Sequence, residues 1–388
     1  MKPLALFGPP VIFACGAWFI FSNPYSQYTS LYIYGLAIAI MAYLAVLMRG
    51  RLRDSAFFLS AILFGLFVIE SFSVARESQP VDTRSEGYSV SQTILGWGPG
   101  HAGIFHQKKA DSKTSQTIFE VDYTIDQHLL RKTLSADHGP AIAFFGDSMT
   151  FGTGLNDADT LPQAFADALR RRVRVLNFGF PGYGPQQFAR ALETSMYDNL
   201  LHENTRYVVY ETSAWHAERS SCRAGFMLRA PRYELNAGEA SYQGTCYGRL
   251  STLVKELFAN TAAYRVFIDP VQGVSKADMD LYIGVIAKAA RLAEERYGAK
   301  TLVVYLPAGE AYLRHSGYSE AEVIAKLRQT GVDVMEAHLD EKTFAGSPLW
   351  IPGDGHPTAL ANKLRADMLK DYLLAAAPEL AQDISLAR

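Results

Sequence analysis

Three apolar stretches dominate the first 77 residues of this 388-residue chain, and they constrain the fold more than any other feature. They run over Leu4–Phe21, Leu31–Met48 and Ala56–Val74, and each is close to the length that crosses a bilayer as a helix. Glu70 is the only charged residue inside them, at a place where an acid near the outer end of a helix can reach the interface. We therefore expect three transmembrane helices, with buried core helices as the alternative.

The charged residues around these stretches predict their orientation. The second link, Arg49–Arg53, holds three arginines, whereas the first link, Ser22–Ser30, carries no charge. The positive-inside rule then places Lys2 and Arg49–Arg53 in the cytoplasm. Everything after about Ser78 is expected outside an inner membrane of the bacterial type, in the periplasm or an equivalent space. A cleaved signal peptide is the alternative for the first stretch.

Cysteine and charge patterns limit the classes of partner. Cys222 and Cys246 flank a polar insertion and could form a disulfide in an oxidising compartment, or could remain two unrelated thiols. A zinc site is disfavoured because neither has a close Cys or His partner, and we expect no metal and no organic cofactor. The net charge of −2, with no basic stripe, gives no reason to expect nucleic acid as a partner.

Beyond residue 77 the pattern predicts two further parts. Residues 78–139 resemble a linker followed by a small β-rich lead-in, with Thr117–Thr124 as an exposed or edge strand. Residues 140–388 alternate strands and helices, interrupted by an insertion at about 217–278 that we expect to form a lid or a cleft wall. Continuous apolar strands favour a parallel sheet covered on both faces, so the fold class is α/β with three α/β/α layers. The expected strands are Ala141–Phe145, Val173–Asn177, Tyr207–Thr212, Thr301–Leu306 and Val332–Met335, and the expected helices are Leu161–Arg171, Pro185–Tyr197, Met279–Tyr297, Ser319–Gln329 and Thr358–Ala375.

A serine follows the first of these strands directly, in Gly146-Asp147-Ser148. Asp354 and His356 stand far away near the other end of the chain, just before the last of these helices. A serine hydroxyl with a distant acid and histidine is the material of nucleophilic acyl transfer. The alternative is a turn that only caps a helix, because Asp and Ser are common at helix starts.

Together with Asn177–Gly184, these blocks resemble the SGNH (GDSL-type) hydrolase family of esterases, lipases and deacylases over residues 140–375. The resemblance implies that Ser148 is the nucleophile, His356 the base and Asp354 the orienting acid. It also implies that the amide of Gly182 helps to stabilise the oxyanion. The family's third block normally supplies an asparagine donor, but no asparagine follows the strand at Tyr207–Thr212. His216 stands near that place, as a substitute donor or as a structural histidine.

The sequence thus favours a membrane-anchored serine esterase that removes acyl groups, such as acetyl, from a cell-envelope glycan, with membrane lipid as the other substrate class. Two alternatives stay open: an O-acyltransferase acting on envelope polysaccharide, and a non-catalytic assembly protein that binds glycan through a degenerate hydrolase domain. The oligomeric state is left undetermined.

Overall fold

The computed structural model describes residues 3–22, 28–76, 81–85, 87–111, 114–248, 258, 261–268, 273–340, 342–343 and 348–386. Its contacts divide the chain into two units. The first comprises Met1–Pro80 with Leu253–Gln272, and the second comprises Val81–Thr252 with Gly273–Arg388. Part of the insertion expected at 217–278 therefore packs with the N-terminal helices. Lys2, used above for the orientation, lies outside the described residues.

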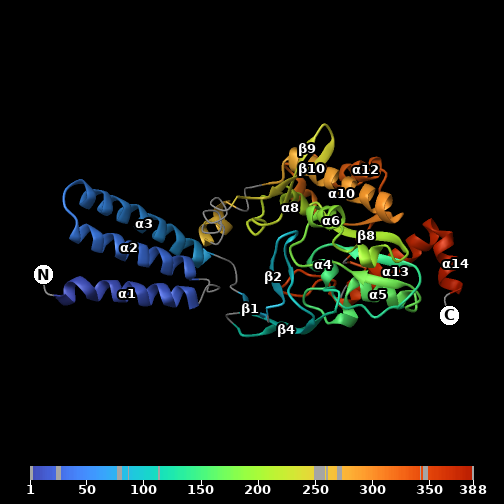
Figure 1. Ribbon diagram of the computed structural model, residues 1–388, viewed down its shortest axis with the longest axis horizontal. Helices are drawn as coiled ribbons and strands as arrows, with labels where there is room; N and C mark the ends of the chain where they lie inside the picture. Colours follow the sequence, from blue (N-terminus) through green and yellow to red (C-terminus); the bar gives the residue numbers. More distant parts are fainter. Residues whose placement is uncertain are drawn as a thin grey trace. The chain divides into compact units, whose positions relative to one another are not determined.

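The first unit contains helices α1 (Pro3–Ser22), α2 (Thr29–Leu47) and α3 (Arg51–Arg76), which pack in sequence order (Figure 1). In the described part of the chain, α2 and α3 are long and apolar enough to cross a membrane. The apolar helix described within α1, Pro9–Ile20, is shorter than the roughly 20 residues that a span needs. The structure thus gives two candidate spans where the sequence predicts three. The unit also contains the short helical run η2 (Tyr264–Ile268).

A five-stranded parallel sheet forms the centre of the second unit, in the order β12-β11-β8-β6-β7. Its strands are β6 (Ala141–Phe145), β7 (Arg174–Asn177), β8 (Thr205–Ser213), β11 (Lys300–Leu306) and β12 (Asp333–Glu336). Alternate residues of β6 belong to two separate cores: Ile142 and Phe144 face one, Ala143 and Phe145 the other. The expected three-layer α/β/α arrangement follows from this division.

One core packs against α5 (Leu161–Ala168) and α13 (Ala359–Ala376), and the other against α6 (Pro185–Glu193), α10 (Lys276–Tyr297) and α12 (Glu320–Gln329). The remaining helices are short or terminal: α4 (Ser148–Phe151), η1 (Asp157–Asp159), α7 (Asp198–Leu201), α8 (His216–Ser220), α11 (Glu310–Leu313) and α14 (Pro378–Leu386). Helix α10 begins at a capping box formed by Ser275 and Asp278, three residues before the start expected from the sequence.

The lead-in consists of antiparallel strands. Strands β1 (Val81–Ser85), β4 (Gly103–Asp111) and β5 (Thr117–Ile125) form one sheet, and β2 (Ser89–Gln92) pairs with β3 (Gly96–Pro99). Phe119, Val121 and Tyr123 of β5 are buried and share a core with Phe145 and Phe151. The lead-in is therefore part of the hydrophobic core beside β6.

The described part of the insertion includes the hairpin β9 (Pro231–Asn236) and β10 (Glu239–Thr245). Cys222 and Cys246 form a disulfide with a Cα–Cα distance of 5.5 Å, which joins the segment after α8 to the end of this hairpin. Of the two alternatives for these cysteines, the structure shows the bridge.

Candidate active site

Ser148 begins helix α4, three residues after strand β6 ends. Asp147 caps this helix, since its Oδ1 accepts the Met149 N–H at 2.9 Å. A Cβ at position 146 would lie 2.0 Å from Thr150 Oγ1, so the tight turn requires the glycine found there. This turn presents Ser148 at the carboxyl end of a central strand, where α/β folds bind their ligands.

His356 and Asp354 meet Ser148 across 208 residues of sequence. The Nε2 atom of His356 lies 2.8 Å from Ser148 Oγ, and its Nδ1 atom is hydrogen bonded to Asp354 Oδ2. Gly355 has a positive φ of 90°, which lets the chain turn between acid and histidine. The structure therefore brings the three predicted triad residues into one hydrogen-bonded chain.

Lys109, from strand β4 of the lead-in, is a member of this cluster that the sequence did not indicate. Its Nζ atom lies 2.5 Å from Asp354 Oδ1, and the Asp354 side chain is only 2% exposed. Burial opposes ionisation of Asp354, but hydrogen bonds from His356 and Lys109 outweigh it and lower the pKa to about 2. The carboxyl group is thus an anion over the whole physiological pH range.

Two backbone amides near the serine are available to an anion. Among the described residues, the N–H groups of Ser148 and Gly182 have no hydrogen-bond partner. Gly182 has a φ of +82°, and a Cβ there would lie 3.1 Å from Trp97 and 3.2 Å from Phe226. The predicted oxyanion glycine thus occupies a position that only glycine adopts without strain, and two aromatic rings lie beside it.

His216 does not join this group. Its side chain is buried, with Nε2 at 3.0 Å from Asp147 Oδ2 and Nδ1 at 2.8 Å from Thr212 Oγ1. Burial lowers its pKa to about 4, so the imidazole is neutral: Nε2–H donates to Asp147 and Nδ1 accepts from Thr212. Because both nitrogens are engaged, the predicted role as oxyanion donor finds no support, and the structural alternative describes the observed geometry.

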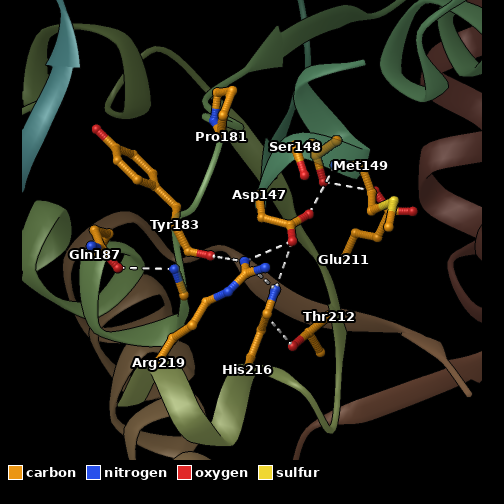
Figure 2. Close-up of polar contacts among 12 residues, drawn as sticks. Asp147, Ser148, Met149, Pro181, Tyr183, Gln187, Glu211, Thr212, His216 and Arg219 are labelled. Carbon is orange, nitrogen blue, oxygen red and sulfur yellow. Dashed lines mark hydrogen bonds and ion pairs between the residues drawn. The ribbon is translucent and has the colours of Figure 1, made fainter. Parts of the chain in front are cut away.

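Arg219, one turn further along α8, connects the two loops that carry the available amides. Its Nη1 atom lies 2.7 Å from Asp147 Oδ2 and 2.6 Å from the carbonyl oxygen of Tyr183. Figure 2 shows the guanidinium between these two oxygens. Asp147 directly precedes Ser148, and Tyr183 directly follows Gly182. Arg219 therefore fixes the distance between the two amide donors.

The charge of Arg219 also controls Asp147. Although burial of Asp147 would by itself raise its pKa, the guanidinium and the His216 hydrogen bond hold the pKa well below its usual range. The sequence did not indicate Arg219. The signal that could have found it is its spacing of three residues from His216, which places both on one face of a short helix.

Glu211 lies within strand β8 beneath this network and is buried. Thr150, in the turn of α4, donates to its Oε2 at 2.7 Å. Burial raises the pKa of Glu211 to about 7, so this acid titrates near neutrality. No group of three or more His, Cys, Asp or Glu side chains in the described part of the chain could hold a metal ion.

Comparison with known proteins adds distant similarity to solved structures. No family model matches the chain, and no curated protein matches it either. A solved structure titled "Structure of a putative lipolytic protein of G-D-S-L family from Desulfitobacterium hafniense DCB-2" resembles it at a TM-score of 0.36 and 13% identity. The match covers 60% of this chain and 98% of the other. The interpretation of the site therefore depends on its geometry.

Proposed function

We propose that this protein is a serine esterase of the SGNH type, anchored in a membrane, that removes acyl groups such as acetyl from a cell-envelope glycan. The observation that carries the proposal is the chain of hydrogen bonds from Ser148 Oγ through His356 to Asp354. A nucleophile, a base within reach of its proton and an acid that orients the base are the parts that acyl transfer needs.

In the proposed reaction, Ser148 Oγ attacks the ester carbonyl while His356 Nε2 accepts the serine proton. Asp354 accepts a hydrogen bond from the Nδ1–H group and stabilises the imidazolium. The amides of Ser148 and Gly182 donate to the oxyanion of the tetrahedral intermediate. His356 then protonates the leaving alcohol. Water attacks the acyl-enzyme while His356 accepts its proton, and His356 returns this proton to Ser148 Oγ as the carboxylic acid leaves.

Arg219 acts here as a positioning residue rather than a catalytic one. No asparagine follows strand β8, where the family would place a side-chain donor to the oxyanion. The oxyanion site then depends on two backbone amides, whose separation is set by the bonds from Arg219 to Asp147 and Tyr183. A fixed donor geometry is what gives such a site its catalytic effect.

Two features support the membrane location. Helices α2 and α3 have the length and apolar composition of spans. The Cys222–Cys246 disulfide suits an oxidising space outside the cytoplasm. The proposal includes a third span at α1, a cytoplasmic N-terminus and a periplasmic second unit.

The aromatic residues beside Gly182 support a glycan substrate. Phe226 is 56% exposed, and its ring centroid lies 6.3 Å from that of Trp97. Trp97 is fixed in turn, since its indole N–H donates to the Pro181 carbonyl oxygen at 2.9 Å. A rigid apolar surface next to polar donors suits a ligand with an apolar face and many hydroxyl groups, as a sugar ring has.

The test uses the full chain in detergent or nanodiscs with a fluorophosphonate probe, which reacts only with an activated serine. We expect labelling of the parent and none of the Ser148→Ala variant, followed by release of acetate from an acetylated glycan. Equal labelling of the two proteins would refute the assignment of Ser148. A folded parent that does not react would favour the non-catalytic alternative. Transfer of the acyl group to an added glycan acceptor, without release of free acid, would identify a transferase.

A further inference from the structure

Glu70 is a buried acid that the proposed reaction does not use. It lies in the apolar helix α3 and is 1% exposed. Its carboxylate accepts three hydrogen bonds: one from the Ser30 hydroxyl near the start of α2, and two from the amides of Ala262 and Ala263 at 2.7 and 2.9 Å. Glu70 therefore joins two N-terminal helices to a segment almost 200 residues away in the sequence.

That segment, Phe258 with residues 261–268, is called the docking segment below. Phe258 and Thr261 form a turn in which the Thr261 hydroxyl donates to the Phe258 carbonyl oxygen at 2.7 Å. A short helical run follows from Ala262 to Ile268. The first amides of a helical run have no partner within it, and they favour a negative charge. Glu70 accepts from these amides, and they add two hydrogen bonds to the one that the Ser30 hydroxyl donates to the buried carboxylate.

The docking segment exposes large apolar side chains. Phe258, Phe267 and Ile268 are 57%, 44% and 43% exposed. Among the described residues, every other exposed phenylalanine except Phe226 lies on α1 or α3, as Phe64 does at 58%. Water is a poor solvent for such groups, and their transfer to an apolar environment is favourable. The hydrogen bonds to Glu70 attach this segment to α3, a candidate span.

We propose that the docking segment is a membrane-surface element, held to α3 by Glu70, whose Phe258, Phe267 and Ile268 enter the interfacial layer of a phospholipid bilayer. This inference rests on the proposed membrane anchor. Since residues 253–272 belong to the first unit, the chain passes between the two units three times, after Pro80, Thr252 and Gln272. The catalytic unit is then tethered to the membrane part by three chain segments instead of one.

The first experiment measures the depth of the docking segment in nanodiscs of phosphatidylcholine and phosphatidylglycerol, with and without doxyl-labelled lipid. The full chain carries Cys15→Ser and one added cysteine, labelled with the fluorophore NBD while the native disulfide stays oxidised. The probe positions are Phe267, Phe58 of α3 at 71% exposure, and Leu235 of hairpin β9–β10 at 37% exposure. We expect lipid quenching at Phe58 and Phe267, and none at Leu235.

The outcomes separate the two claims. If the probe at Phe58 is not quenched, the proposed membrane anchor is wrong, and so is the membrane-surface role of the docking segment. If the probe at Phe58 is quenched but the probe at Phe267 is no more quenched than the one at Leu235, the proposed role of the docking segment is wrong and the anchor stands. A cooperative thermal unfolding transition, measured on the same samples, verifies that each protein is folded.

The second experiment tests the role of Glu70. Glu70→Leu should lower the quenching at Phe267 by half or more and leave Phe58 unchanged. Ser71→Ala is the matched control, because the Ser71 hydroxyl donates only within α3, to the Phe67 carbonyl oxygen at 2.7 Å. Unchanged quenching at Phe267 in the Glu70→Leu protein would overturn the assignment of Glu70.

Discussion

Replacement of Arg219 by methionine should damage catalysis more than substrate binding. The change keeps most of the side-chain volume but removes the Nη1 hydrogen bonds to Asp147 at 2.7 Å and to the Tyr183 carbonyl oxygen at 2.6 Å. The two amide donors of Ser148 and Gly182 then lose the contact that fixes their separation. The loss of one aligned oxyanion donor costs about 2.7–4 kcal/mol, or about 10²–10³ in kcat.

The same change also leaves Asp147 without its cationic partner. The Asp147 side chain is 2% exposed, and removal of one partner of a buried pair typically costs 3–5 kcal/mol. Arg219 itself is 15% exposed, so we expect the lower end, about 3 kcal/mol of unfolding free energy. Stability and turnover should therefore both fall, and the assay must measure them separately.

The assay follows p-nitrophenyl acetate hydrolysis by the full chain, with kcat and KM determined separately below the thermal midpoint of each variant. Arg219→Met should lower kcat about 100-fold with KM changed about threefold at most. Added guanidinium should restore part of kcat to Arg219→Ala and none to Ser148→Ala. Arg223→Met is the matched control, since Arg223 pairs with Asp278 at 2.6 Å, and it should lose stability without loss of kcat. A folded Arg219→Met protein with kcat within about twofold of the parent would refute the positioning role.

Three further predictions concern the surroundings of the site. Lys109→Met removes one of the two side chains that hold the Asp354 carboxylate, so we expect its pKa to rise while it stays ionised, and kcat/KM, measured from pH 4 to 9, to fall about tenfold because the acid orients His356 less firmly. Gly182→Ala should lower kcat at least tenfold, because the φ of Gly182 is +82° and the added Cβ would meet two aromatic rings. The control Gly238→Ala, at φ +87° in open space, should lose about 1–2 kcal/mol of stability and no activity. Glu211 binds its proton more tightly in the folded protein, where its pKa is about 7 against an ordinary 4.5. The protonated acid therefore contributes about 3 kcal/mol to the free energy of unfolding below pH 4.5, and this contribution is lost as the pH rises through 7. Glu211→Gln should flatten this part of the stability profile in thermal unfolding from pH 4 to 8, and a parent without the decline would contradict the reasoning.

The sequence predicted the parts of this fold that depend on local patterns. The continuous apolar run Ala141–Phe145 and the alternating run Thr117–Thr124 became a buried parallel strand and an edge-type strand. Both patterns depend on which face of a strand meets the core, and that information is local. The number of spans was predicted less well, because apolar length alone does not establish a crossing helix at α1.

The residues that surround the predicted triad could not be predicted in the same way. Lys109 and Arg219 reach the site from a sheet and a helix whose positions depend on tertiary packing, and neither belongs to a motif. Glu70 was expected near the outer end of its helix, where it can reach the interface, yet its partners Ala262 and Ala263 lie about 190 residues away. Pairings of this length depend on loop closure and packing, which no local pattern encodes.

The contacts of His216 and Arg219 with Asp147 have a consistent electrostatic explanation in the proposed reaction. An ionised Asp147 directly before the nucleophile would repel the developing oxyanion, and two unit charges about 4 Å apart interact by about 4 kcal/mol at an effective dielectric constant of about 20. That repulsion is as large as the effect of one oxyanion donor. Arg219 neutralises Asp147 at 2.7 Å, while His216, kept neutral by burial, adds a hydrogen bond without a second positive charge. The pair thus makes a buried carboxylate compatible with an anionic transition state, and two backbone amides remain available to bind it.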